Sequence, residues 1–216
     1  MSPRFVGTLL LIIILACIAT GVIVYPNLSA TLISHWDAAG RANGTMGKFW
    51  GTFLLPLMML AFSGLWSFLP RIDPIAPGFK SFRYVYDFFF FLLIAFLAYV
   101  YALSLGANLG WQFNMLTMTL PALALFILIL GALMPYMKRN WFIGIRTPWT
   151  ISDDIVWDKT HRLGGTLFEV AALFIFAGIF VSPKVATWFI LIPIIAATLI
   201  SIIYSYVIFA RIKRTN

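Results

Sequence analysis

The 216-residue chain has few of the residue types on which soluble enzymes and metal proteins depend. It contains one cysteine, Cys17, which cannot form an intramolecular disulfide or a cysteine metal site. Only 10% of its residues are charged, and no polar linker or low-complexity tract divides it. These absences exclude a disulfide scaffold and argue against a separate soluble domain. We therefore expect residues 1–216 to form a single membrane domain.

What the chain has is apolar sequence: 62% of its residues are hydrophobic and its mean hydropathy is +0.97. A membrane-spanning helix needs about 20 consecutive apolar residues, and runs of that length recur here. Continuous Leu, Ile and Phe runs favour helices over the alternating strands of a barrel. The sequence therefore predicts an all-α, polytopic membrane bundle with about six transmembrane helices, at Phe5–Tyr25, Phe49–Leu69, Tyr84–Leu105, Leu116–Tyr136, Gly165–Val181 and Ala186–Ala210.

The distribution of basic residues predicts the orientation, because cytoplasmic loops retain Lys and Arg. With the N-terminus inside, 12 of the 15 basic residues lie on the cytoplasmic side, and only Arg41, Lys48 and Lys184 lie outside. We therefore expect both termini in the cytoplasm. The formal net charge of +8 then reflects orientation and contact with anionic lipid, with no need for nucleic acid. We also expect the first apolar run to be a retained helix rather than a signal peptide.

Two loops are long enough to carry a site: an outer loop at 26–48 and an inner loop at 137–164. The outer loop lies within an N-terminal two-helix unit at 1–70, and the inner loop lies within a four-helix region at 84–210; both belong to the one membrane domain. In the outer loop, Asn43-Gly44 and Gly40 are turn signals that predict a small ordered loop or hairpin. Trp36 is expected to anchor this loop at the depth of the lipid headgroups, where tryptophan is enriched. His35 and Asp37 are two candidate metal ligands, too few to predict a metal site.

The inner loop combines basic and aromatic residues, so it also suits the membrane surface. Ser152 is expected to cap a helix that begins before the fifth span. On that helix Asp158 and Arg162 are spaced for an ion pair, and Trp157 and His161 share a stripe. The pair Gly164-Gly165 permits a kink or a close helix contact, of which close packing is the better explanation.

Two carboxylates, Asp87 and Glu169, fall at membrane depth, where an ionisable residue is costly and often functional. With His161 they are the candidate acid and base of a membrane-embedded enzyme acting on lipid or peptide. Alternatively, each carboxylate reaches the interface or pairs with a basic neighbour such as Arg83. Prolines within the apolar spans leave a small transporter as a further alternative.

One long pattern resembles a known family. Asn140-Trp141-Phe142-Ile143-Gly144-Ile145-Arg146-Thr147-Pro148-Trp149-Thr150, followed by Trp157 and by Thr160-His161-Arg162-Leu163-Gly164-Gly165, resembles the signature of the SdpI family of bacterial membrane proteins. His35-Trp36-Asp37-Ala38-Ala39-Gly40 with Asn43-Gly44 looks like the domain of unknown function that often precedes it.

The resemblance implies immunity and signal transduction at the cell membrane rather than catalysis. It implies protection against a membrane-active toxin peptide met on the outside, and binding of a cytoplasmic repressor inside. No cofactor and no direct nucleic-acid contact is expected. The candidate binding residues are Arg146, Thr147, Trp149, Trp157, His161 and Arg162 on the inner side, and His35, Trp36, Asp37, Asn43 and Gly44 on the outer side.

Overall fold

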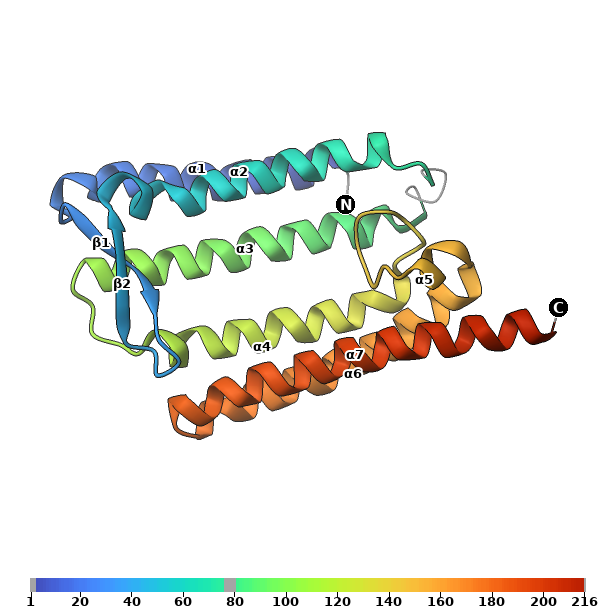
Figure 1. Cartoon of the computed structure of the whole chain (residues 1–216). Coiled ribbons are helices and arrows are strands. Elements are labelled where there is room, and N and C mark those ends of the chain that lie inside the picture. The colour runs from blue at the N-terminus through green and yellow to red at the C-terminus, as the bar shows by residue number, and fades with distance from the viewer. Residues whose placement is uncertain (1–2, 76–80, 216) are drawn as a thin grey trace.

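The computed structural model describes residues 3–75 and 81–215 and shows a bundle of long helices crossed at one end by a β-hairpin (Figure 1). Six helices are long and apolar enough to cross a membrane, so the predicted all-α polytopic bundle is confirmed. In chain order the elements are α1 (Pro3–Val24), η1 (Tyr25–Asn27), β1 (Thr31–Trp36), β2 (Ala42–Gly47), α2 (Lys48–Ile72), α3 (Arg83–Asn108), α4 (Met115–Leu133), η3 (Met134–Tyr136), α5 (Pro148–Ser152), α6 (Asp154–Ala177), η4 (Gly178–Phe180) and α7 (Pro183–Thr215).

The fifth long helix begins earlier than its predicted span and has a different cap. Helix α6 begins at Asp154, and Asp153 is its N-cap, with a side chain that accepts from the backbone N–H groups of Ile155 and Val156. The prediction that Ser152 caps this helix was wrong, because Ser152 is the last residue of the short helix α5. The apolar run alone could not locate this start, since the first three turns of α6 carry polar residues.

The helices pack as two groups that meet at α3 and α4. Helix α3 contacts α1, α2 and α4, whereas α6 contacts α4 and α7. The backbones of α4 and α6 approach closely at two glycines, because a Cβ on Gly165 would lie 2.6 Å from the carbonyl oxygen of Gly131. The expectation that Gly164-Gly165 serves close packing is therefore confirmed. Within the chain, α2, α4 and α7 each continue through an internal proline, Pro56, Pro121 and Pro193 respectively.

The hairpin β1–β2 lies across the end of the bundle opposite the two termini (Figure 1). The Asn108 side chain at the end of α3 bonds both backbone groups of Ile33, with distances of 2.7 and 3.0 Å. At the hairpin tip, Asn114 donates to the Ala39 carbonyl at 2.7 Å and Thr187 of α7 donates to the Ala38 carbonyl at 3.0 Å. The hairpin thus connects the ends of α3, α4 and α7. We call this the hairpin end, and the opposite one the terminal end.

Candidate functional site

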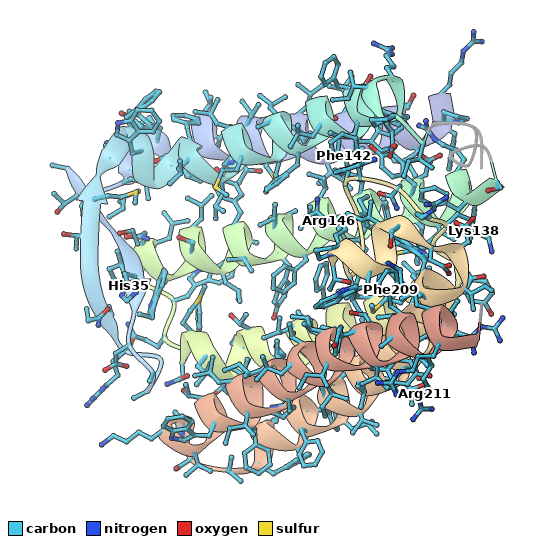
Figure 2. All side chains as sticks on the ribbon, turned by 45° about the vertical axis from the view of Figure 1, so that its right-hand side comes forward. His35, Lys138, Phe142, Arg146, Phe209 and Arg211 are labelled. Carbon is cyan, nitrogen blue, oxygen red and sulfur yellow. The ribbon has the colours of Figure 1, made fainter. Side chains whose placement is uncertain are left out.

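The candidate residues of the two long loops lie at opposite ends of the bundle (Figure 2). His35 belongs to the hairpin, whereas Arg146, Lys138 and Phe142 lie at the terminal end. The two histidines are therefore separated by the length of the helices, as the sequence predicted. Each end has its own geometry.

At the hairpin end, His35 and Asn43 face each other across the two strands, with Nδ1 of His35 2.6 Å from Oδ1 of Asn43. Gly44 pairs with His35 in the ladder, and a Cβ on Gly44 would lie 2.9 Å from the His35 Cβ. Trp36 pairs with Ala42. Asn43-Gly44 thus lies within β2 at an irregular part of the ladder and not in the turn, whereas the predicted hairpin and the turn at Gly40 are confirmed.

The turn itself is organised by Asp37 and by Gly40, which has a φ of +73°. One Asp37 carboxylate oxygen accepts from the backbone N–H groups of Ala39 and Arg41, at 2.8 and 2.9 Å. The second oxygen lies 3.3 Å from the Arg41 guanidinium. The Arg41 backbone N–H, with that of Ala39 and the Arg41 charge, holds the pKa of the Asp37 carboxyl below its usual value. Both oxygens of the Asp37 carboxylate have partners within the turn, so Asp37 and His35 do not form a metal site together.

At the terminal end, residues Met137–Thr147 form an ordered loop between η3 and α5, which we call the 137–147 loop. Its centre is Asn140, which is 1% exposed. The Asn140 amide donates to the carbonyls of Lys138 and Ile143, and its oxygen accepts from the N–H groups of Phe142 and Ile143, all within 2.9 Å. One side chain therefore satisfies four backbone groups that have no helix or strand partner.

Helix α6 supports this loop through Trp157 and His161, both 0% exposed. The two rings stack with centroids 4.0 Å apart. Trp157 Nε1 donates to the Met137 carbonyl at 2.7 Å, and the Ile145 backbone N–H donates to His161 Nε2 at 3.0 Å. Since Nε2 accepts, Nδ1 carries the ring proton and donates to the Trp157 carbonyl at 2.9 Å. His161 is thus a neutral positioning residue for the loop backbone.

The loop reaches this close to His161 because residue 144 is glycine. Gly144 has a φ of +113°, which L side chains rarely adopt. A Cβ at this position would also collide with His161 Nε2. The spacing of Gly144 and His161 in the family signature therefore has a local physical cause.

Hydroxyl groups fix the end of the loop to helix α7. Thr147 is the N-cap of α5 and forms a capping box with Thr150. Its hydroxyl also lies 3.0 Å from the Ser205 hydroxyl of α7, and all three residues are buried. Trp149, on α5, packs against Tyr206 of α7 with ring centroids 5.1 Å apart.

The N-terminal helices reach the same loop through Asp73, directly after α2. This carboxylate is 4% exposed and accepts from the Ile75 and Trp141 backbone N–H groups, at 2.8 and 3.1 Å. The second bond joins residues 68 positions apart. Asp73 therefore holds the loop against the first half of the chain.

The basic residues of this end differ in their partners. Arg139 pairs with Asp154 at 2.7 Å, and Lys138 lies 4.0 Å from Asp158. Asp158 thus faces Lys138 rather than Arg162, the partner that helical spacing predicted. Arg146 donates to the Trp141 carbonyl at 2.7 Å, and no carboxylate of the described residues forms an ion pair with it.

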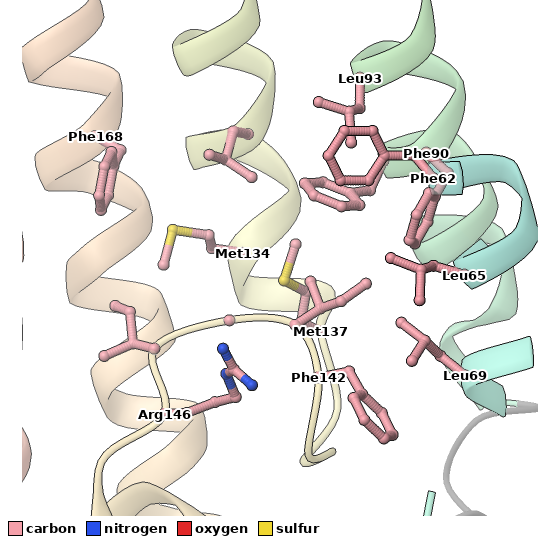
Figure 3. Close-up of a pocket in the computed structure, with 15 residues that line it drawn as sticks. Phe62, Leu65, Leu69, Phe90, Leu93, Met134, Met137, Phe142, Arg146 and Phe168 are labelled. Carbon is pink, nitrogen blue, oxygen red and sulfur yellow. The ribbon is translucent and has the colours of Figure 1, made fainter. Parts of the chain in front are cut away.

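Beside the loop lies a cavity of about 400 Å³ (Figure 3). The loop closes one end of it with Met137, Phe142 and Arg146, and Phe168 of α6 flanks it. Its remaining wall is largely apolar, with Phe62, Leu65 and Leu69 from α2 and Phe89, Phe90 and Leu93 from α3. Among the described residues that line it, Arg146 is the one ionisable side chain.

The membrane-depth carboxylates are not brought together with His161. Asp87 is 2% exposed and accepts at Oδ1 from Trp66 Nε1 at 2.7 Å and from Arg83 Nε at 2.8 Å. Its expected pairing with Arg83 is therefore present. Glu169 is half-buried at the close contact of α6 with Gly131 of α4. Within residues 3–75 and 81–215, no hydrogen bond joins any two of Asp87, His161 and Glu169.

Three residues that hold the 137–147 loop were not predicted as site residues: Asn140, Asp73 and Ser205. Asparagine side chains often hydrogen-bond the backbone two residues on in turns, and this tendency could have identified Asn140. Asp73 and Ser205 offered no such signal, because their roles depend on contacts with distant parts of the chain.

Comparison with known proteins bears on both ends of the molecule. The SdpI/YfhL protein family matches residues 136–205, which run from the 137–147 loop to Ser205, and a domain of unknown function, DUF1648, matches residues 12–60, which include the hairpin. The chain is also 24% identical to the immunity protein SdpI of Bacillus subtilis (strain 168), over 90% of this chain and 92% of that protein. No solved structure matches it. The chain is therefore a multi-pass membrane protein that is similar to the SdpI family at residues 136–205, and it also matches the preceding domain that the sequence predicted.

Proposed function

We propose that this protein protects a bacterial cell against a membrane-active toxin peptide, acting at the plasma membrane without catalysing a reaction. The observation that carries the proposal is the similarity to an immunity protein over nearly the whole of both chains. The matched segments include two features that lie outside the long helices, the hairpin and the 137–147 loop. Loss of either feature is therefore expected to impair protection.

The proposed orientation places both termini and the 137–147 loop in the cytoplasm and the hairpin outside. Its support is the excess of Lys and Arg at the terminal end. In this orientation the hairpin meets a secreted peptide, and the basic terminal end faces the cytoplasm, where a repressor protein is the proposed partner. For peptide binding at the hairpin to change repressor binding at the terminal end, the packing of the helices would have to change between the two ends.

The orientation is tested by cysteine labelling in intact cells. The native Cys17 is buried in α1, and Cys17→Ser removes it as a background signal. In that background, Thr45→Cys in β2 and Lys159→Cys in α6 place a thiol at an exposed position of each end. We expect a membrane-impermeant maleimide to label the Thr45→Cys variant in intact cells and the Lys159→Cys variant only after permeabilisation. The opposite pattern would reverse the proposed orientation.

Protection is tested by survival of a susceptible host, with and without the protein, under a panel of secreted toxin peptides. We expect expression to raise survival against at least one membrane-active peptide. His35→Ala and His161→Ala, at matched membrane levels, then assign the effect to the hairpin end or the terminal end. Survival equal to that of the empty host across the panel would reject the proposed function.

A further inference from the structure

We propose that the cavity beside the 137–147 loop binds one acyl chain of an anionic phospholipid, whose phosphate is held by Arg146. The lining is apolar except at one end, where the loop contributes Arg146. Figure 3 shows the Arg146 guanidinium at the loop end of the lining, opposite the end formed by Phe90 and Leu93. A site with an apolar body and one cation at its mouth matches a ligand with an apolar tail and an anionic head.

The charge balance of this end supports an anionic ligand. The three aspartates that approach basic side chains here are Asp87, Asp154 and Asp158, and they lie by Arg83, Arg139 and Lys138. Asp73 is satisfied by backbone N–H groups. Arg146, in contrast, has a backbone carbonyl as its partner and no carboxylate among the described residues. Its guanidinium retains donors that a phosphate can accept in a bidentate manner.

The depth of the cavity matches one leaflet of a bilayer. Its deepest lining residues include Leu93, ten residues into α3, and Phe62, ten residues before the end of α2. At 1.5 Å per residue, each lies roughly 15 Å from the end of its helix. The hydrocarbon core of a bilayer is about 30 Å thick, so this distance is about one leaflet. A lipid with its phosphate at Arg146 would extend its chain along the lining.

The size of the cavity favours an acyl chain over a peptide. A helix with side chains is about 10–12 Å across and rises 1.5 Å per residue, so about 400 Å³ would hold only roughly three helical residues. A membrane-active helix would therefore have to separate α2 and α3 from the loop. A single flexible acyl chain fits the cavity without separating α2 and α3 from the loop.

The test is native mass spectrometry of the purified protein in detergent micelles, with added dioleoyl phosphatidylglycerol or dioleoyl phosphatidylcholine. We expect one bound phosphatidylglycerol, preferred over phosphatidylcholine. Arg146→Gln should weaken phosphatidylglycerol binding by about tenfold or more, because a charge-assisted hydrogen bond is lost. Arg71→Gln is the matched control, since Arg71 is an exposed arginine at the same end, in the last turn of α2, and it should bind as the wild type does.

A second variant, Leu93→Trp, fills the cavity without changing charge and should reduce binding of both lipids. If it fails to fold, judged by its unfolding midpoint, the Arg146→Gln and Arg71→Gln pair still decides the result. Equal binding by wild type and Arg146→Gln would overturn the proposal, as would equal losses in Arg146→Gln and Arg71→Gln. Labelling of the cavity by a photoreactive apolar peptide in preference to lipid would also overturn it. The assay needs no toxin, so its outcome is independent of whether the protein confers protection.

Discussion

Gly144→Ala is expected to lower the free energy of unfolding by about 3–5 kcal/mol, from backbone strain at a positive φ and from loss of the bond to His161. Gly144 has a φ of +113°, and its missing Cβ is what allows the Ile145 N–H to reach His161 Nε2. With alanine at position 144, the loop would have to move away from His161 and α6. The measurement is denaturant unfolding in detergent micelles, which compares the variant with the wild type at equal protein concentration.

Two glycine controls separate the causes of this effect. Gly110 has a φ of +92° and no atom within 4 Å of an added Cβ, so Gly110→Ala tests backbone strain alone. Gly64 lies inside α2 with equally open space, and Gly64→Ala should stabilise the helix by about 0.5–1 kcal/mol. A Gly144→Ala variant no less stable than Gly110→Ala would show that the contact with His161 does not support the loop.

Asn140→Ala is expected to cost about 3 kcal/mol, because buried backbone groups lose a hydrogen-bonding partner. Asn140 is 1% exposed and makes four hydrogen bonds to the backbone of Lys138, Phe142 and Ile143. Alanine leaves two N–H groups and two carbonyls without that partner. Denaturant unfolding gives the energy, and hydrogen exchange at the Phe142 and Ile143 amides should rise along with it.

Asn114→Ala is the matched control for this variant. Asn114 is a half-buried asparagine that also bonds backbone groups, as the N-cap of α4 and through the Ala39 carbonyl. Loss of an N-cap typically costs about 1 kcal/mol. If Asn140→Ala destabilised the protein no more than Asn114→Ala, the 137–147 loop would not depend on its central side chain.

The helices could be predicted from the sequence because their cause is local. Long apolar runs require a bilayer, and backbone groups in a bilayer must pair within the helix. The pairing of Asp87 with Arg83 follows from helical spacing in the same way. Gly164-Gly165 could be assigned to packing, although its partner Gly131 on α4 could not.

The hairpin was predicted, but the exact place of its turn and the contacts of the 137–147 loop were not, because side-chain hydrogen bonds to the backbone determine both. At the hairpin, Asn43-Gly44 is a strong turn signal, but the Asp37 carboxylate organises the turn several residues earlier. At the loop, two of the contacts come from residues distant in the sequence, Asp73 after the end of α2 and Ser205 of α7. A single sequence has no local pattern that reports such contacts.

The central claim is that the protein confers protection and that the 137–147 loop, which carries Arg146, is one of the two features on which protection depends. The most direct measurement is survival of a toxin-challenged host that expresses the wild type, Arg146→Gln or the control Arg71→Gln at equal membrane levels. We predict that the wild type and Arg71→Gln protect the host and that Arg146→Gln does not. Full protection by Arg146→Gln would contradict the claim.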